Sequence, residues 1–487
     1  RMLENDPFLL KQLFAYSGKK PVSDQEISAA NHHAVSYLKQ KGLFPEGIQD
    51  RIVSGLVNSA EQIASLCVTL PERNYNEKDR RLDRILTGRL AAYPAMAALL
   101  ALIFWITLAG ANQLSALLSD LLFSFQHVLE QVLLFLHVPV LLREAFIYGI
   151  YQVLAWVVSV MLPPMAVFFP LFTLLEDSGY LPRIAYNLDR PFQCCKACGK
   201  QALTMAMGFG CNAAGITGCR IIDSPRERLI AILTNNFMPC NGRLPLFITL
   251  ILLFLCSSQQ NASSYAVSAL ILTLFILLGI AMTFLSSYLL SATVLRGVSS
   301  SFTLEMPPYR RPQIGKVILR SVTDRTLFVL GRAAAVAAPA GLILWLLANV
   351  SPGGISLLSR ISLILDPLGR LLGMDGVILT AFILGLPANE IVLPIILMAY
   401  TAQGNLTGYS STLQLKQILT ANGWTWTTAV CVMLFSLMHW PCSTTLITIY
   451  KETKSARWTL VSAILPAFFG ALCCILFTAF TRFFLLP

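Results

Sequence analysis

The amino-acid sequence predicts an all-α, polytopic helical membrane protein. Of its 487 residues, 55% are hydrophobic and only 13% are charged, whereas soluble domains carry about 25% charged residues. The hydrophobic residues gather in runs of roughly twenty, the length that an α-helix needs to cross a bilayer. The basic residues lie between these runs, as in cytoplasmic loops. The net charge of +11 therefore indicates membrane topology and no nucleic-acid partner.

The chain begins with a polar, helix-prone stretch. We interpret residues 1–85 as a cytosolic helical region and residues 86–487 as a transmembrane transporter domain. Four arginines stand just before the first hydrophobic run, and they are Arg80, Arg81, Arg84 and Arg89. Because basic residues flank spans on the cytoplasmic side, this cluster predicts a cytoplasmic N-terminus.

About seven membrane spans follow from the hydrophobic runs. They are predicted over 90–110, 146–175, 228–256, 265–289, 327–349, 423–450 and 458–482. The second contains the pair Pro163-Pro164, which predicts an interruption. The stretch 111–142 is hydrophobic but carries acidic residues and histidines, so it predicts one or two interfacial helices on the outer side. Loops 178–228 and 296–325 are rich in Lys and Arg and should be cytoplasmic, whereas 257–264 is uncharged and should be external.

Two hydrophobic pieces fit no clean span and predict re-entrant gate hairpins, one over 199–224 and one over 376–402. An ungapped comparison aligns the stretch that begins at Leu188 with the stretch that begins at Leu365. The identical pairs fall at turn-forming and polar positions. They are Leu188 with Leu365, Asp189 with Asp366, Gly199 with Gly376, Gly208 with Gly385, and Asn212 with Asn389.

A second correspondence follows each hairpin. The pairs Pro239-Cys240 and Pro441-Cys442 both interrupt a predicted span, and proline frees a backbone carbonyl there. We infer two gate repeats, about 146–289 and 327–482. The first hairpin begins from a predicted cytoplasmic loop and the second from an external one, so the repeats are inverted. Secondary transporters built this way place their substrate site near the midplane, where the helix breaks meet.

The predicted breaks concentrate polar and sulfur-containing side chains in hydrophobic surroundings. The candidate metal-binding residues are Cys211, Asn212, Met238, Cys240, Asn389, Glu390 and Cys442. Glu390 is the only acid in the middle of a hydrophobic membrane segment, which marks it as functional; the alternative is a structural ion pair with Arg243 or Arg332. Sulfur, amide and carboxylate donors together suit a borderline transition metal better than Na⁺ or Mg²⁺.

Other motifs carry less information. Cys194, Cys195 and Cys198 contain one CxxC, which is a weak zinc signal without a second pair. Redox regulation or metal capture at the cytoplasmic mouth is the functional alternative, and we expect these thiols to tune transport without being essential. The sequence contains no HExxH and no GxxxxGK[ST], the motifs of zinc proteases and P-loop proteins.

The gate motifs resemble those of the bacterial ferrous iron transport protein B family. Residues 207–247 resemble its first gate region, and 175–183 the segment that precedes it. LGLPANEIVLP at 384–394 is similar to the second gate, and the Pro-Cys at 441–442 to the final broken span. The family usually has proline where Ala214 stands here. The resemblance covers most of the chain from residue 78 onward.

This resemblance implies Fe²⁺ uptake across the cytoplasmic (inner) membrane, with Cys211, Cys240, Glu390 and Cys442 as pore residues. Fe²⁺ is then the transported ion, and no permanently bound cofactor is expected. The resemblance also implies regulation by a GTP-binding domain, which the sequence lacks and which the same or a separate chain would supply. A small cytosolic accessory protein for iron transport is a further expected partner.

Two other functions remain open from the residues. A transporter of organic solutes such as nucleosides could use a related gate repeat, but it would favour aromatic and amide groups at the breaks over cysteines. A membrane enzyme or an assembly scaffold is the second alternative, because three cysteines and one glutamate could mimic a catalytic set.

Overall fold

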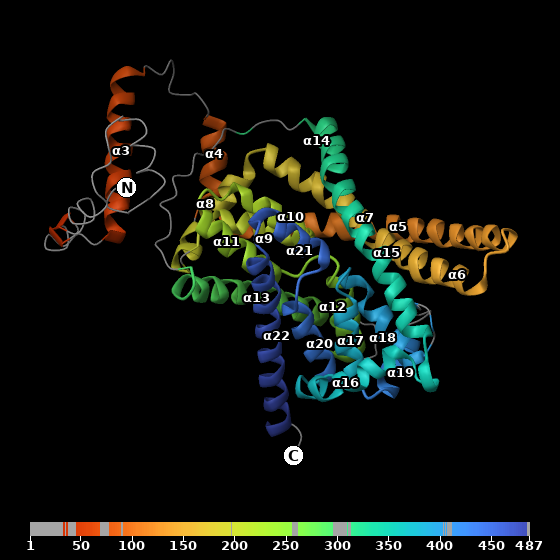
Figure 1. Cartoon of the computed structure of the whole chain (residues 1–487). Coiled ribbons are helices and arrows are strands. Elements are labelled where there is room, and N and C mark those ends of the chain that lie inside the picture. The colour runs from red at the N-terminus through yellow and green to blue at the C-terminus, as the bar shows by residue number, and fades with distance from the viewer. Residues whose placement is uncertain are drawn as a thin grey trace, which may run out of the picture. The chain divides into compact units, whose positions relative to one another are not determined.

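The computed structural model describes most of the chain as helix (Figure 1). The described residues are 33–34, 36–37, 45–68, 77–88, 91–195, 197–255, 262–295, 309, 313–402, 404, 406 and 412–484. They include no strand. Residues 257–261 of the predicted external loop and much of the cytoplasmic loop at 296–325 lie outside them, whereas 262–264 belong to the helix α13 (Ala262–Ala292). The chain divides into two compact units: residues 1–78 with 298–303, and residues 79–297 with 304–487.

The first unit contains α3 (Pro45–Cys67). The second unit holds the candidate membrane spans and the gate repeats. Helix α4 (Glu77–Leu86) belongs to it from residue 79 onward, although the sequence pattern grouped this helix with the N-terminal region.

Six helices among the described residues are long and hydrophobic enough to cross a membrane, or seven if one bent pair counts as a single span. They are Gln113–Phe135, Val140–Asp177, Val267–Ala292, Val329–Asn349, Trp426–Thr453 and Ala456–Phe483. The bent pair is Leu357–Leu371 with Gly376–Leu384. The predicted polytopic helical membrane protein is therefore confirmed.

The first helix of this domain is longer than predicted. Helix α5 runs without interruption over Ala92–Phe135, so the predicted break at 110 and the separate helices over 111–142 are wrong. No glycine or proline occurs between Ala111 and Leu136, and isolated polar side chains do not end a helix. The turn comes just before Pro139, and the chain returns along α5 (Figure 1).

Helix α7 (Gln152–Asp177) continues through Pro163 and Pro164, so the predicted interruption there is also wrong. Proline in a helix removes one hydrogen bond and bends the axis. Neighbouring helices can hold such a segment in place. Helix α7 packs along both α5 and α15 (Leu327–Asn349), which stabilises it.

The two gate hairpins have the same construction. In the first, α8 (Tyr180–Cys194) turns back into α9 (Lys200–Gly210). In the second, α16 (Leu357–Leu371) turns back into α17 (Gly376–Leu384). An offset of 177 residues carries both ends of α8 onto both ends of α16, and it is the offset of the sequence alignment.

The turn of each hairpin is closed by the same contact. The Gly199 N–H donates to Asp189 Oδ1 over 2.8 Å, and the Gly376 N–H donates to Asp366 Oδ1 over 3.1 Å. A Cβ atom on either glycine would collide with a backbone carbonyl of the preceding helix. The aspartates and glycines identical between the repeats therefore fix the geometry of the turn.

The break after each hairpin's inner helix is also repeated. Cys211 has φ −154° and ψ 126°, and the aligned Ala388 has φ −154° and ψ 127°. After these extended residues come α10 (Asn212–Gly218) in the first repeat, and η8 (Asn389–Ile391) with α18 (Val392–Thr401) in the second. One asparagine thus begins the outgoing helix in each repeat.

Each Pro-Cys break docks on the hairpin of its own repeat. The Asn241 N–H donates to Gly210 O over 3.4 Å, and the Ser443 N–H donates to Leu386 O over 2.8 Å. Asn241 and Ser443 each directly follow the Pro-Cys pair. The correspondence therefore extends from sequence to backbone hydrogen bonds.

The broken spans differ in how far they are divided. The span predicted at 228–256 consists of short helices, chiefly α11 (Pro225–Thr234) and α12 (Leu244–Leu250). Between them runs a non-helical stretch around Pro239 and Gly242. In the second repeat, α20 (Trp426–Met438) and α21 (Ser443–Thr453) are separated by four residues only.

The hairpins approach helix α22 (Ala456–Phe484) from opposite ends (Figure 1). At its beginning, Arg220 beyond the first hairpin pairs with Glu452, which lies just before α22. At its end, Arg482 Nη2 donates to Arg370 O, near the end of α16 in the second hairpin, over 3.2 Å. This arrangement agrees with the predicted inversion of the repeats.

Candidate functional site

A buried chain of polar contacts joins the two gate hairpins through both helix breaks. Asn212 Nδ2 donates to Asn236 Oδ1 over 3.2 Å, and Asn236 Nδ2 donates to His439 O over 2.7 Å. His439 Nε2 lies 3.2 Å from Asn389 Oδ1. All four residues are buried. The asparagines that begin the two outgoing helices, both of them predicted site residues, are therefore connected inside the protein.

Arg243 lies at the centre of this region and is 1% exposed. Its Nη1 donates to Asn236 O over 3.0 Å and to Leu437 O over 2.9 Å, and its Nη2 donates to Asn236 Oδ1 over 3.1 Å. The described ion pairs include none with Glu390. The sequence pattern offered Arg243 only as an ion-pair partner of that acid and missed its role between the breaks.

The predicted pore residues surround the same breaks but form no closed metal cage. Cys211 is buried, Cys240 and Cys442 are half-buried, and all three thiols are free. Cys211 lies within electrostatic range of the other two thiols, and Cys240 within range of Glu390. Among the described residues, no three His, Cys, Asp or Glu side chains lie close enough together to hold a metal ion. Their role as metal ligands stays a prediction.

The remaining predicted ligands differ in what they present. Met238 is fully buried in a hydrophobic cluster with Phe192, Met205 and Phe209, and its side chain lines neither of the two cavities described below. Asn212 Oδ1 is buried and has no hydrogen-bond partner among the described residues, so it is an available acceptor.

A cavity of about 140 Å³ lies beside Glu390. Helices α12 and α18 supply most of its wall, and α7 completes it through Trp156. The Glu390 carboxylate lies directly against Gly242, where a Cβ atom would be 2.6 Å from the carboxyl carbon Cδ. Because Gly242 has no side chain, the carboxylate can reach the first Pro-Cys break.

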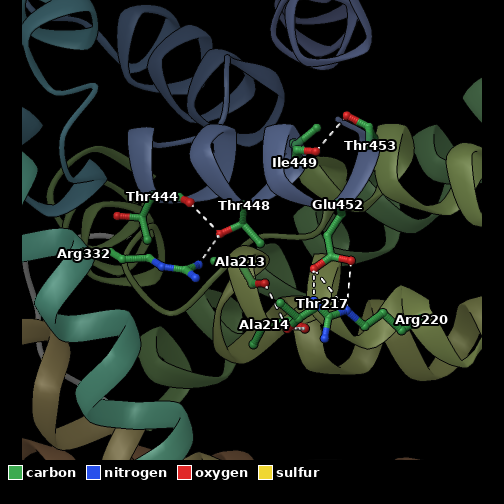
Figure 2. Close-up of polar contacts among 10 residues, drawn as sticks. All are labelled: Ala213, Ala214, Thr217, Arg220, Arg332, Thr444, Thr448, Ile449, Glu452 and Thr453. Carbon is green, nitrogen blue, oxygen red and sulfur yellow. Dashed lines mark hydrogen bonds and ion pairs between the residues drawn. The ribbon is translucent and has the colours of Figure 1, made fainter. Parts of the chain in front are cut away.

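A larger cavity of about 410 Å³ lies between α7, α10, α15 and α21. Its wall includes several charged residues (Figure 2). Arg220 forms a bidentate ion pair with Glu452, in which Nη2 donates to Oε1 over 2.6 Å and Nε donates to Oε2 over 2.9 Å. Arg332 Nη1 lies 3.2 Å from Thr448 Oγ1. The Arg220–Glu452 pair joins the first repeat to the second, whereas Arg332 and Thr448 both belong to the second.

The two cavities occupy corresponding positions of the two repeats. The alignment of the hairpins and that of the Pro-Cys breaks relate the residues that line one cavity to those that line the other. The corresponding pairs are Ala213 with Glu390, Thr217 with Pro394, Arg220 with Leu397, Thr448 with Leu246, and Lys451 with Thr249. Arg220 and Lys451 of the larger cavity thus correspond to the uncharged Leu397 and Thr249 of the smaller one, whereas Glu390 of the smaller cavity corresponds to Ala213. Each cavity adjoins a break, the smaller one at Gly242 and Asn389 and the larger one at Ala213.

The cysteine cluster before the first inner helix does not form an exposed pair. Cys194 is exposed and Cys195, the first thiol of the CxxC, is half-buried, whereas Cys198 is buried against Ile216, Cys219 and Ile449. Burial, with a smaller contribution from the Glu227 carboxylate, raises the pKa of the Cys198 thiol to about 12. The described geometry therefore gives this CxxC no ready metal site.

Comparison with known protein families agrees with the repeat. The Gate family, described as nucleoside recognition, matches residues 158–254 and 330–456, and these two segments fall within the two gate repeats. The family described as the ferrous iron transport protein B C terminus matches residues 272–324.

Individual relatives of the chain also carry the name of an iron transporter. The Fe(2+) transporter FeoB of Staphylococcus aureus (strain MSSA476) is 30% identical over 416 residues, which are 82% of this chain and 58% of the relative. The protein of the same name from Methanocaldococcus jannaschii is 26% identical over 481 residues, 94% of this chain and 66% of the relative. The chain thus spans about three fifths to two thirds of the length of these relatives. No solved structure matches it. The sequence motifs, the repeated gate and these matches together show that the chain belongs to the ferrous iron transport protein B family and carries its membrane part.

Proposed function

We propose that this multi-pass membrane protein carries Fe²⁺ across the cytoplasmic membrane, along a path from the Glu390 cavity through the two Pro-Cys breaks to the charged cavity. The observation that supports this most is the pair of cavities lined by corresponding segments of the two repeats, each of which adjoins a break. Inverted-repeat transporters place their substrate site where such breaks meet. The relatives that match most of the chain are named Fe(2+) transporters.

Glu390 would attract the ion first. It is the one acid on the wall of the smaller cavity, and its neighbours there are mostly hydrophobic. A carboxylate in such surroundings replaces part of the hydration shell that a divalent cation loses on leaving water. The contact with Gly242 would bring the ion to the first Pro-Cys break.

The thiols of Cys240, Cys442 and Cys211 would receive the ion next. Sulfur donors favour a borderline metal such as Fe²⁺ over Mg²⁺ or Ca²⁺. Dispersed ligands also suit conduction, because an ion must bind well enough to enter and weakly enough to leave. A closed cage of three or more ligands would hold the ion, and the described residues contain none.

Fe²⁺ flux into liposomes that contain the purified chain tests the proposal. We expect metal-dependent flux in the parent, and strong losses in Cys211→Ser, Cys240→Ser, Glu390→Gln and Cys442→Ser with unchanged protein level and thermal stability. Parent-like flux in all four variants would place the path elsewhere. Absence of flux in the stable parent would contradict transport by this chain alone.

We further propose that the N-terminus is cytoplasmic, that the membrane is the inner one, and that a GTP-binding domain and a small accessory protein act with the chain. The basic cluster before α5 supports the orientation. External labelling of a cysteine introduced at position 80 of the full chain would contradict it.

A second candidate substrate is an organic solute, because the Gate family is described as nucleoside recognition. The larger cavity, at about 410 Å³, lies within the range of about 300–1,000 Å³ typical of small-molecule sites. The smaller one, at about 140 Å³, does not. Uridine flux in the same liposomes, without Fe²⁺ flux, would favour this function.

A further inference from the structure

An ion pair on the wall of the larger cavity shelters its carboxylate and exposes its arginine (Figure 2). Arg220 Nη2 lies 2.6 Å from Glu452 Oε1, and the two side chains are 71% and 11% exposed. The carboxylate therefore lies on the protein side of the pair and the guanidinium on the solvent side. Arg220 also belongs to the basic loop 178–228, which should be cytoplasmic. The pair thus lies at the boundary between protein and solvent on the predicted cytoplasmic side.

The position of Glu452 in its helix does not favour an acid. The residue lies in the last turn of α21, which ends at Thr453. The helix dipole places partial negative charge at that end, so a carboxylate there is repelled, whereas a lysine such as the neighbouring Lys451 is favoured. The stability of the helix therefore gives no reason for a glutamate here, and the reason lies in what the carboxylate contacts.

The positions that correspond to this pair in the other repeat carry no charge. The hairpin alignment relates Arg220 to Leu397, and the alignment of the Pro-Cys breaks relates Glu452 to Leu250. Both leucines are buried. A gate repeat can therefore fold with hydrophobic side chains at these positions, so the ion pair belongs to the larger cavity and not to the repeat as such.

We propose that Glu452 is the last carboxylate to bind Fe²⁺ on its way out through the larger cavity, and that Arg220 is the cation with which the ion exchanges, an inference that rests on the proposed function. At equal distance a divalent ion attracts a carboxylate about twice as strongly as a guanidinium does. An exposed ion pair is also weak, so the arriving ion displaces Arg220. When the ion leaves for water, Arg220 returns and neutralises the carboxylate.

The size of the cavity suits such a weakly held ion. At about 410 Å³, it has room for an ion together with several water molecules, each of which occupies about 30 Å³ in the liquid. A hydrated divalent ion needs only one or two carboxylates from the protein. One carboxylate with a competing arginine therefore suffices for binding, and it lets the ion leave again.

Fe²⁺ flux into liposomes distinguishes a ligand from a structural ion pair. Glu452→Gln and Arg220→Gln break the same pair, so a structural role would make both variants lose flux equally. At subsaturating Fe²⁺, we expect Glu452→Gln to lower flux by about tenfold, because it removes the attraction between ion and carboxylate. Arg220→Gln should carry at least as much Fe²⁺ as the parent there, because nothing competes for the carboxylate.

The chain offers a matched control for these variants. Lys200 and Asp223 form another ion pair of 2.6 Å, and neither residue lines either cavity. Asp223→Asn should therefore carry Fe²⁺ like the parent. Equal losses in Glu452→Gln and Arg220→Gln would overturn the inference, and so would parent-like flux in Glu452→Gln.

A measurement on the parent tests the exchange without transport and without a variant that must fold. Phenylglyoxal modifies exposed arginines, and mass spectrometry gives the rate at each one. Fe²⁺ that takes the Glu452 carboxylate releases Arg220, so under anaerobic conditions it should speed the modification of Arg220 in the purified chain by about two- to fivefold. Arg360, an exposed arginine outside both cavities, should react at an unchanged rate.

The two measurements separate this inference from the proposed function. Faster modification of Arg220 in a stable parent that shows no flux would contradict transport by the chain alone and support the exchange at Glu452. Flux in the parent, with no effect of Fe²⁺ on the modification of Arg220, would overturn the exchange and support transport.

Discussion

One methyl group added at Gly242, which lies against Glu390, tests the proposed path most sharply. In Gly242→Ala, the added Cβ would lie 2.6 Å from Glu390 Cδ and 3.2 Å from Cγ, and closer still to Oε1. Such distances are far below ordinary van der Waals contact, so the carboxylate must move. Overpacking of this kind costs about 1–3 kcal/mol.

If that cost falls on the conducting geometry, flux should drop by roughly 5- to 150-fold, since about 1.4 kcal/mol corresponds to a factor of ten. Fe²⁺ flux into liposomes measures it. Gly315→Ala is the control, because nothing lies within 4 Å of the Cβ it would add. Parent-like flux in Gly242→Ala would refute the assignment of Glu390 to the path.

A second change separates displacement of the carboxylate from general damage. Glu390→Asp shortens the side chain by one methylene and should relieve the collision with an alanine at position 242. The double variant should therefore carry more Fe²⁺ than Gly242→Ala alone. If the double variant is worse than either single one, the carboxylate is not what the methyl group displaces.

Three further outcomes are expected. Arg220→Glu should weaken the contact between η3 (Cys219–Ile221) and α21 by only about 0.5–1 kcal/mol, because the arginine is largely exposed. The double variant Arg220→Glu with Glu452→Arg should restore the thermal stability that the single change removes. Burial, with the hydrogen bond to Asp83, raises the pKa of Tyr309 to about 12, so the stability that this contact adds is complete below pH 10 and is lost as the pH rises through 12. The difference in tyrosinate absorbance between the parent and Tyr309→Phe measures this pKa, and titration of Tyr309 near pH 10 would contradict it. Cys198 should react with iodoacetamide at pH 8 more slowly than the exposed thiol four residues before it, and mass spectrometry showing equal rates would contradict the buried environment.

The sequence predicts the gate hairpins well because their geometry depends on a few local residues. Asp189 with Gly199, and Asp366 with Gly376, close the two turns by the same hydrogen bond. Such contacts span ten residues and leave identical letters at identical spacing. The Pro-Cys breaks are visible for a similar reason, since proline cannot continue the helical hydrogen bonding.

Long-range contacts leave no comparable signal. Arg243 follows a predicted break by three residues, yet its partner Leu437 is 194 residues away in the sequence. Arg220 and Glu452 meet across the two repeats, and neither residue stands out in its own segment. Met238 shows the converse limit, because a sulfur atom at a break can point into a hydrophobic cluster.

The lengths of the helices are the other feature that the sequence did not predict. Hydrophobic runs mark where a chain can cross a membrane, but helices end only where glycine, proline or a cap ends them. Helix α5 therefore continues to Phe135, and α7 passes through Pro163 and Pro164. The contacts of α7 with α5 and α15 hold the helix together at these prolines, and the local sequence pattern could not indicate such contacts.

Inhibition of Fe²⁺ flux by Cd²⁺ tests the central claim most directly, because it asks whether the moving ion meets sulfur at both breaks. Cd²⁺ binds thiols strongly, so low concentrations should block flux through the parent. The concentration needed for half-inhibition should rise in Cys240→Ser and in Cys442→Ser, and it should rise further in the double variant. Equal sensitivity to Cd²⁺ in the parent and in the double variant, at measurable flux, would contradict a path through the paired Pro-Cys breaks.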